Sequence, residues 1–81
     1  MRIVVRLFAV VRERAGRPQV ELDVGEGASV AQAIDALKTR LPQIAEVMKR
    51  VGYAVNREYV GVEEILKEGD ELAIIPPVSG G

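Results

Sequence analysis

One amphipathic helix, beginning at Ser29, restricts the fold of this chain more than any other feature of its sequence. Ser29 and Gln32 have the S-x-x-Q spacing of a capping box, which predicts where the helix begins. Apolar residues then recur at helical spacing along one face: Val30, Ile34, Leu37 and Leu41. A helix with a single apolar stripe must bury that stripe against another layer of structure, and the rest of the chain predicts strands.

Two segments before this helix alternate apolar and polar residues, as strands with one buried face do. Their apolar positions are Ile3, Val5 and Leu7 in the first segment, and Val20, Leu22 and Val24 in the second. Residues 9–15 between them are good helix formers, and Gly16 is a typical residue just beyond a helix end. The sequence therefore predicts two antiparallel strands joined through a short helical turn.

The chain after the main helix predicts shorter elements. Pro42 is acceptable as the first residue of a second, short helix over residues 42–50. Asn56 and Arg57 separate two short apolar runs, which predicts a tight hairpin. We expect a turn of helix and then a glycine-containing loop over residues 63–70. Residues 71–75 are mostly apolar, which predicts a strand in the middle of the sheet.

The predicted order of elements is two strands, the main helix, two short strands and a last strand. A sheet with one helix on one face follows, and the right-handedness of parallel crossovers leaves few ways to connect the elements. The simplest is an α+β fold of the β-grasp type, with a mixed sheet of four to five strands. At 81 residues the chain is long enough for one domain and too short for two.

Composition excludes several classes of function. The chain has no cysteine and no histidine, so thiolate metal sites, cysteine nucleophiles and Ser-His-Asp arrangements cannot be built from it, and we expect no metal site. Eleven basic residues nearly balance twelve acidic ones, and Arg12, Arg14 and Arg17 form only a short cluster, so we expect no nucleic-acid binding. The apolar stretches of the chain are far shorter than the roughly 20 residues of a membrane span. We therefore expect a cytoplasmic protein without membrane attachment.

The sequence closes with "IIPPVSGG", a segment without a charged side chain. Pro76 and Pro77 end the last strand and stiffen the chain, and six residues from Pro76 reach at most about 20 Å. Gly80 and Gly81 lack side chains, so they can enter a channel that would exclude a Cβ atom. We expect residues 1–75 to form the domain and residues 76–81 an extended arm that probes another protein's active site.

Four segments carry a resemblance to a known family. They are "LFAVVRERAG", "EGASVAQAIDALKTRLP", "AVNREYV" and "LKEGDELAIIPPVSGG", and the last is the most specific. Together they cover most of the chain. The sequence closely resembles the small subunit of molybdopterin synthase, the MoaD-type sulfur carriers with a ubiquitin-like β-grasp fold.

The resemblance implies a chemical cycle at Gly81. An E1-like, MoeB-type enzyme would use ATP to adenylate the carboxylate, and sulfur would then replace AMP to give a thiocarboxylate. The loaded arm would insert into a MoaE-type large subunit and donate sulfur to cyclic pyranopterin monophosphate. The active complex of the family is a heterotetramer. This chain would bind no cofactor, and we expect no catalysis from it alone.

The resemblance also assigns roles to further residues. The inserted arm would consist of Pro76, Pro77, Val78, Ser79 and Gly80, with Gly80 giving clearance in the channel. Candidates for the partner interface are Phe8, Arg12, Tyr59 and Ile75. Phe8 is expected on the strand face opposite Ile3 and Leu7.

Other functions are compatible with the same sequence. A carrier of the same chemistry could serve tRNA thiolation or thiazole synthesis, although thiazole carriers are typically shorter and lack the "LFAVVRERAG" segment. A ubiquitin-like protein modifier would also begin with adenylation of Gly81 and would end in an isopeptide bond to lysine. A plain interaction module, using only the sheet face, would keep its function without Gly80 and Gly81.

Overall fold

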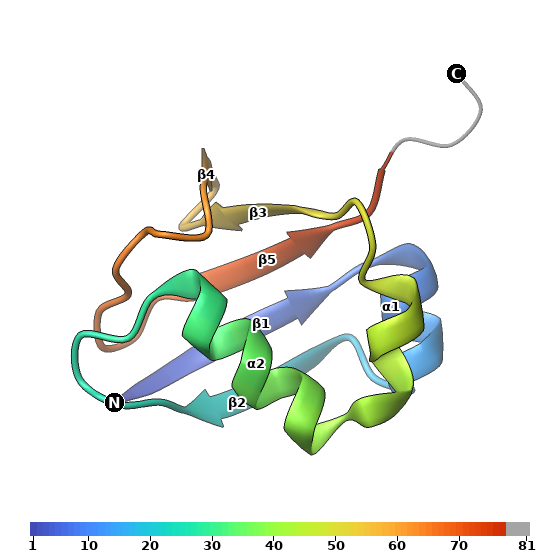
Figure 1. The fold of residues 1–81 in the computed structure, drawn as a ribbon, viewed down its shortest axis with the longest axis horizontal. Coiled ribbons are helices and arrows are strands. Elements are labelled where there is room, and N and C mark those ends of the chain that lie inside the picture. Colours follow the sequence, from blue (N-terminus) through green and yellow to red (C-terminus); the bar gives the residue numbers. More distant parts are fainter. Residues whose placement is uncertain (78–81) are drawn as a thin grey trace.

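The fold is a five-stranded mixed sheet with one long helix packed across one face (Figure 1). A computed structural model describes residues 1–77. Its elements are, in chain order, β1 (Arg2–Leu7), α1 (Ala9–Ala15), β2 (Gln19–Asp23), α2 (Val30–Arg40), a 3₁₀ helix η1 (Pro42–Val47), β3 (Gly52–Val55), β4 (Glu58–Val60) and β5 (Glu71–Ile75). The predicted α+β architecture is confirmed.

The strand order across the sheet is β2-β1-β5-β3-β4. β1 pairs antiparallel with β2 and parallel with β5, while β3 pairs antiparallel with both β5 and β4. β5 is therefore the central strand, as its apolar run predicts. The parallel pairing of the first and last strands sends both toward the same end of the sheet.

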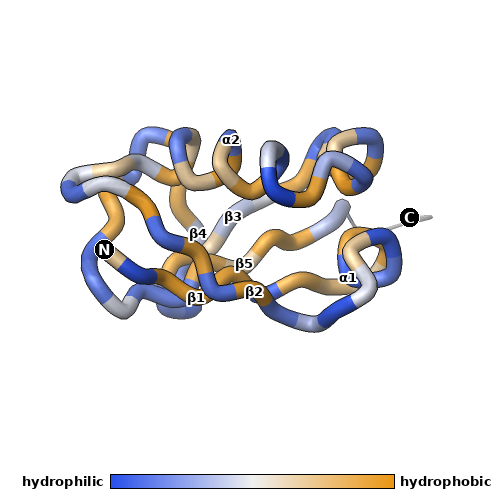
Figure 2. Tube along the Cα trace, turned by 90° about the horizontal axis from the view of Figure 1, so that it is seen from below, coloured by the Kyte–Doolittle hydropathy of each residue, from blue (hydrophilic) through white to orange (hydrophobic). Residues whose placement is uncertain are grey.

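α2 covers a single face of the sheet, and the core lies between these two layers (Figure 2). Val30, Ile34 and Leu37 are buried along the predicted stripe, and Leu41 just beyond the helix end is buried as well. They pack with the inward side chains of β1, β2 and β5, in one cluster that also holds residues of α1 and η1. None of the helices in residues 1–77 is long and apolar enough to cross a membrane.

Local sequence signals account for the helix ends and the hairpin. The Ser29 side chain accepts a hydrogen bond from the Gln32 N–H at 3.2 Å, and the Gln32 side chain accepts one from the Ser29 N–H at 2.9 Å, so the capping box is confirmed. Gly16 ends α1 in the left-handed conformation, with φ 80°. Asn56 and Arg57 both have positive φ between β3 and β4, as a tight two-residue hairpin requires.

Two of the expected elements differ in the structure. The segment after Pro42 is a 3₁₀ helix that ends at Val47, not a helix over residues 42–50. The helical turn expected within residues 63–70 is wrong, because this segment has two turns and an isolated antiparallel bridge between Ser29 and Ile65. The Leu66 N–H donates to the Ala28 carbonyl at 2.8 Å, and its side chain is buried. Hydrogen bonding between this segment and the residues just before α2 thus overrides the local helix preference of residues 63–70.

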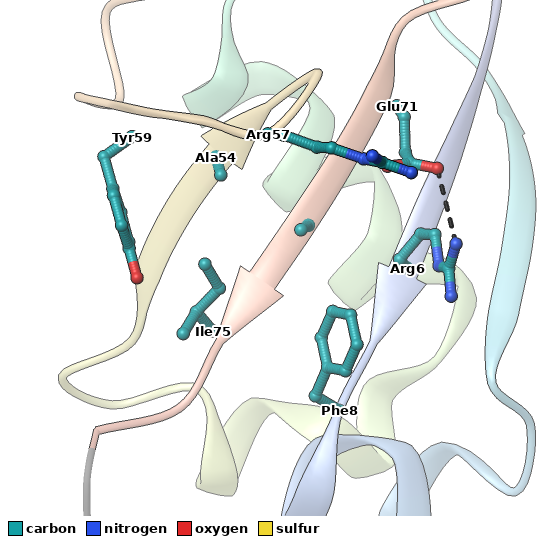
Figure 3. Close-up of a pocket in the computed structure, with 8 residues that line it drawn as sticks. Arg6, Phe8, Ala54, Arg57, Tyr59, Glu71 and Ile75 are labelled. Atoms are coloured by element: carbon teal, nitrogen blue, oxygen red, sulfur yellow. Dashed lines mark ion pairs between the residues drawn. The ribbon is translucent and has the colours of Figure 1, made fainter.

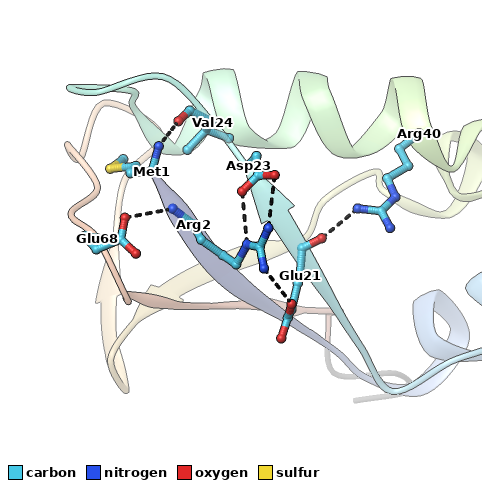
Figure 4. A network of polar contacts seen from close by, with 7 residues as sticks. All are labelled: Met1, Arg2, Glu21, Asp23, Val24, Arg40 and Glu68. Atoms are coloured by element: carbon cyan, nitrogen blue, oxygen red, sulfur yellow. Dashed lines mark hydrogen bonds and ion pairs between the residues drawn. The ribbon is translucent and has the colours of Figure 1, made fainter.

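Polar contacts tie the amino-terminal strand β1 to the edge strand β2 (Figure 4). The Arg2 guanidinium donates from Nε to an oxygen of Asp23 at 3.0 Å and lies 3.3 Å from a carboxylate oxygen of Glu21. The Met1 amino group donates to the Val24 carbonyl at 2.6 Å. Arg40 at the end of α2 donates to the Glu21 carbonyl at 2.6 Å, so the helix is tied to the outer strand β2.

The Arg2–Asp23 pair makes stability depend on pH. Its hydrogen bond, and then the positive charge of Arg2, hold the pKa of Asp23 below its usual value of 3.8. A lowered pKa in the folded state stabilises the fold above the pKa of the unfolded chain, and this contribution disappears as the pH falls through the folded value. We expect Asp23→Asn to lower the free energy of unfolding slightly at pH 7. Urea titrations should show this difference shrinking toward pH 2, and a difference that grew there would contradict the assignment.

Candidate functional site

The face of the sheet opposite α2 carries an open depression of about 400 Å³ (Figure 3). Residues of four strands, of the hairpin between β3 and β4, and the residue that links β1 to α1 line it: Arg6, Phe8, Ala54, Arg57, Tyr59, Glu71, Ala73 and Ile75. Most of these side chains are apolar, and charged groups stand on one side. We call this surface the sheet-face depression.

The floor of the depression follows from strand alternation and register. Along β5, Leu72 and Ile74 point into the core, so Ala73 and Ile75 point to the opposite face. Ala73 pairs with Ala54 of β3, which brings two small side chains together in the centre of the sheet. Because neither extends beyond a methyl group, the surface is low there and the larger neighbours form walls around it.

Phe8 forms one wall, beyond the end of β1. It is the residue before α1, with an extended backbone (φ −133°, ψ 154°), and 39% of its surface is exposed. The Arg6 guanidinium carbon lies 5.9 Å from the centre of the Phe8 ring, within range of a cation–π contact. Arg6 also lies 3.5 Å from a carboxylate oxygen of Glu71 (Figure 3). Arg6 thus contacts both the Phe8 ring and the Glu71 carboxylate, and links these two parts of the depression.

Tyr59 stands on the far side, on the edge strand β4. It pairs with Ala54 in the strand register, so its side chain emerges on the same face of the sheet. Its exposed fraction is 78%, the largest among the exposed large apolar and aromatic side chains of residues 1–77. Arg57, in the hairpin turn, directs its guanidinium toward Glu71 across the depression (Figure 3). The walls therefore combine two aromatic rings with two arginines.

The structure brings together three of the four residues proposed as a partner interface. Phe8, Tyr59 and Ile75 all line the sheet-face depression, although they lie far apart in sequence. Arg12 does not line it and is exposed on α1. Phe8 and Arg6 lie on the face opposite Ile3 and Leu7, as strand alternation predicts.

The polar members of the depression were missed by sequence reasoning. Arg6, Arg57 and Glu71 occupy positions that read as ordinary solvent-facing residues of strands and turns. The alternation of β1 does place Arg6 beside Phe8 on the outer face. Only the parallel register of β1 with β5, which pairs Arg6 with Ala73, brings it near Glu71.

β5 ends at Ile75, next to this surface, and the chain continues into the predicted arm. Gly52 of β3 is the register partner of Ile75, the last residue of the strand. Pro76 is half-buried and Pro77 is exposed, so the chain leaves the sheet at these two residues (Figure 1). The remaining arm residues, Val78 to Gly81, lie outside the described residues.

Known proteins match this chain over nearly its whole length. A family model described as "ThiS family" matches residues 5–81. The molybdopterin synthase sulfur carrier subunit of Chlamydomonas reinhardtii is 42% identical over 83 residues, covering 100% of both chains. The protein of the same name from Arabidopsis thaliana is also 42% identical, covering 98% of this chain and 82% of its own length.

Solved structures agree with the fold. The crystal structure of small archaeal modifier protein 1 from Haloferax volcanii superposes with a TM-score of 0.91 at 35% identity, covering 100% of both chains. A complex of subunits 1 and 2 of the molybdopterin-converting factor from Helicobacter pylori contains a chain that matches with a TM-score of 0.73. Coverage is again 100% of both chains, but the identity is 21%, so this match shows the β-grasp fold alone.

Proposed function

This chain belongs to the ThiS family, and we propose on that basis that it is the sulfur carrier subunit of a molybdopterin synthase. The observation that carries the proposal is similarity over the full length of sulfur carrier subunits, with a family match that extends to Gly81. The absence of cysteine and histidine is compatible with a protein that carries sulfur only on a terminal carboxylate.

The chemistry takes place at Gly81. A carboxylate is a poor electrophile because it is already negatively charged, so it must first be activated. We propose that an E1-like, MoeB-type enzyme directs the Gly81 carboxylate to the α-phosphorus of ATP, which forms an acyl adenylate and releases pyrophosphate. A sulfur nucleophile supplied by a partner then displaces AMP, and the product is a thiocarboxylate. ATP is held by the activating enzyme, and this chain binds no cofactor.

The arm delivers this group to a second partner, a MoaE-type large subunit. Pro76 and Pro77 have fixed φ angles and lack backbone donors, so they direct the chain away from β5. Val78 and Ser79 continue the arm, and Gly80 passes where a Cβ atom would not fit. Sulfur is then transferred to cyclic pyranopterin monophosphate in the large subunit, within a heterotetramer of two small and two large subunits.

The sheet-face depression is the surface that we propose contacts the partner while the arm is inserted. It lies beside the last residue of β5, so a protein that takes up the arm must approach this face. Its aromatic walls are side chains of the kind that contribute most at interfaces. Arg12, which lies outside the depression, would contact the partner only at the periphery.

Truncation of Phe8 tests this surface. We expect Phe8→Ala to weaken binding to the large subunit about 10- to 30-fold, because a large aromatic side chain is removed from the proposed interface. Isothermal titration calorimetry with the purified large subunit measures the effect. Val62→Ala is the matched control, since Val62 is similarly exposed (47%) but lies outside the depression. Equal effects of the two substitutions would refute the role of this face.

The function itself is tested by mass spectrometry of the intact protein. Incubation with the E1-like enzyme, ATP and a sulfur donor should raise the mass by the difference between sulfur and oxygen. Loaded protein mixed with the large subunit and the pterin precursor should then return to its original mass as molybdopterin appears. A protein that stayed unmodified with an active enzyme would exclude this mechanism.

A second candidate function is protein modification, favoured by the similarity to small archaeal modifier protein 1. Modification would start from the same adenylate but end with Gly81 joined to a lysine. Immunoblots of cell extract against a tagged chain distinguish the two functions. A modifier gives conjugates of high mass, whereas a dedicated sulfur carrier gives the free protein only.

We further propose a cytoplasmic location, where ATP and the pterin precursor are available. The absence of cysteine means that the fold needs no oxidising compartment.

A further inference from the structure

Charge is separated along the longest axis of the molecule, although the net charge is only −1. The end at which β5 finishes carries exposed basic side chains of α1, of the turn after it and of the turn before β3: Arg12, Arg14, Arg17, Lys49 and Arg50. We call these the basic rim. The opposite end, formed by the loops before α2 and before β5, carries Glu26, Glu63, Glu64, Glu68 and Asp70 (Figure 1).

Strand register places the basic rim around the start of the arm. Lys49 and Arg50 lie in the turn just before β3, whose first residue, Gly52, pairs with Ile75. On the other side, Leu7 pairs with Ile74, and α1 begins two residues after Leu7. α1 is also tied to η1, the helix that leads to Lys49 and Arg50, because Arg14 donates to the Gln43 carbonyl at 3.5 Å and lies 3.7 Å from a carboxylate oxygen of Glu46.

Most of the positive charge at this end is not neutralised locally. Within residues 1–77, the ion pairs involve none of Arg12, Arg17, Lys49 and Arg50. Glu13 and Glu46 are the acidic residues of these segments, and Glu46 is already next to Arg14. A surface that meets this end of the molecule therefore meets a net positive charge.

We propose that the basic rim steers the arm toward an acidic opening, in which Asp and Glu side chains surround the channel of the adenylating enzyme. This inference rests on the proposed function, because the arm must enter that enzyme in every cycle of sulfur loading. When the arm is inserted, the residues around its start face the residues around the channel. Opposite charges there raise the rate of encounter and align the long axis of the carrier with the opening.

The same charges fit a protein surface better than a bound phosphate. The rim side chains are exposed and come from separate elements, and none is buried beneath the surface to form a closed anion site. Exposed ion pairs contribute little to the stability of a complex. The effect should therefore appear in the association rate and its salt dependence, while the dissociation rate stays nearly constant.

Two lysines allow a matched test. Lys49 lies in the basic rim and Lys67 at the acidic end; both are exposed, and neither forms an ion pair within the described part of the chain. Lys49→Glu and Lys67→Glu change the net charge by the same amount. Stopped-flow measurement of association with the purified adenylating enzyme, at low and high salt, compares the two positions directly.

We expect Lys49→Glu to slow association about 3- to 10-fold at low salt, and Lys67→Glu to change it less than about 2-fold. The difference should vanish in 1 M salt, where the screening length is about 3 Å. Equal effects of the two substitutions, or faster association of Lys49→Glu, would overturn the proposal. If wild-type protein binds the enzyme but gains no sulfur, the sulfur-carrier function fails, and the rate comparison still decides the role of the rim.

Discussion

Deletion of Gly80 and Gly81 is expected to abolish sulfur loading and molybdopterin formation completely. The reacting carboxylate would then belong to Ser79, which is two residues short of the adenylation site and carries a side chain. Mass spectrometry of the intact protein and a molybdopterin assay with the large subunit measure the two losses. A shortened chain that still supported molybdopterin formation would contradict every carrier mechanism at Gly81 and leave a plain interaction module.

The fold should survive this deletion, which separates loss of chemistry from loss of structure. The core cluster is formed by side chains as far as Ile74, and the last strand, β5, ends at Ile75, six residues before Gly81. Urea unfolding should therefore give the same midpoint and slope for the shortened and full-length proteins. Val62→Ala provides a control with full sulfur loading, because Val62 lies outside both the arm and the sheet-face depression.

Truncation of Leu37 is expected to have the largest effect on stability. Leu37 is fully buried where α2 meets the sheet, and replacing a buried leucine by alanine removes contacts and leaves a cavity. We expect Leu37→Ala to lower the free energy of unfolding by about 3 kcal/mol. Urea titration followed by circular dichroism measures the change, and a loss below about 1 kcal/mol would mean that α2 does not anchor the core.

Asp35→Ala is the control on the same helix. Its side chain is exposed and forms no ion pair among residues 1–77. Alanine is also the best helix former, so the unfolding free energy should change by no more than about 0.5 kcal/mol. A large loss for Asp35→Ala would point to general sensitivity of the helix instead of burial of Leu37.

The elements that were predicted correctly are those whose structure depends on residues close together in the sequence. The capping box needs only Ser29 and Gln32, and the hairpin needs Asn56 and Arg57 in the turn. The segment around Ile65 and Leu66 was predicted wrongly because its structure depends on a distant partner. Its backbone pairs with the residues just before α2, and this pairing is absent from any local pattern.

In the candidate site, too, single residues could be proposed from the sequence, whereas their grouping depends on distant parts of the chain. Phe8, Tyr59 and Ile75 were proposed from the family resemblance, and nothing in the sequence showed that they share a surface. Strand register brings them around two alanines and adds Arg6, Arg57 and Glu71, which sequence reasoning did not single out. The basic cluster in α1 was visible in the sequence, but its proximity to Lys49 and Arg50 was not.

The sequence by itself determined the secondary structure of the principal elements, the β-grasp class and the chemical character of the Pro-Pro and Gly-Gly segments. These properties depend on side-chain periodicity and backbone preference over a few residues, so short stretches of the sequence are enough to predict them. Only the tertiary structure decided which outward side chains meet on the open face and which charges surround the start of the arm. Those neighbours are set by strand pairing between residues far apart in the chain, and such pairing follows from burial of the whole core together.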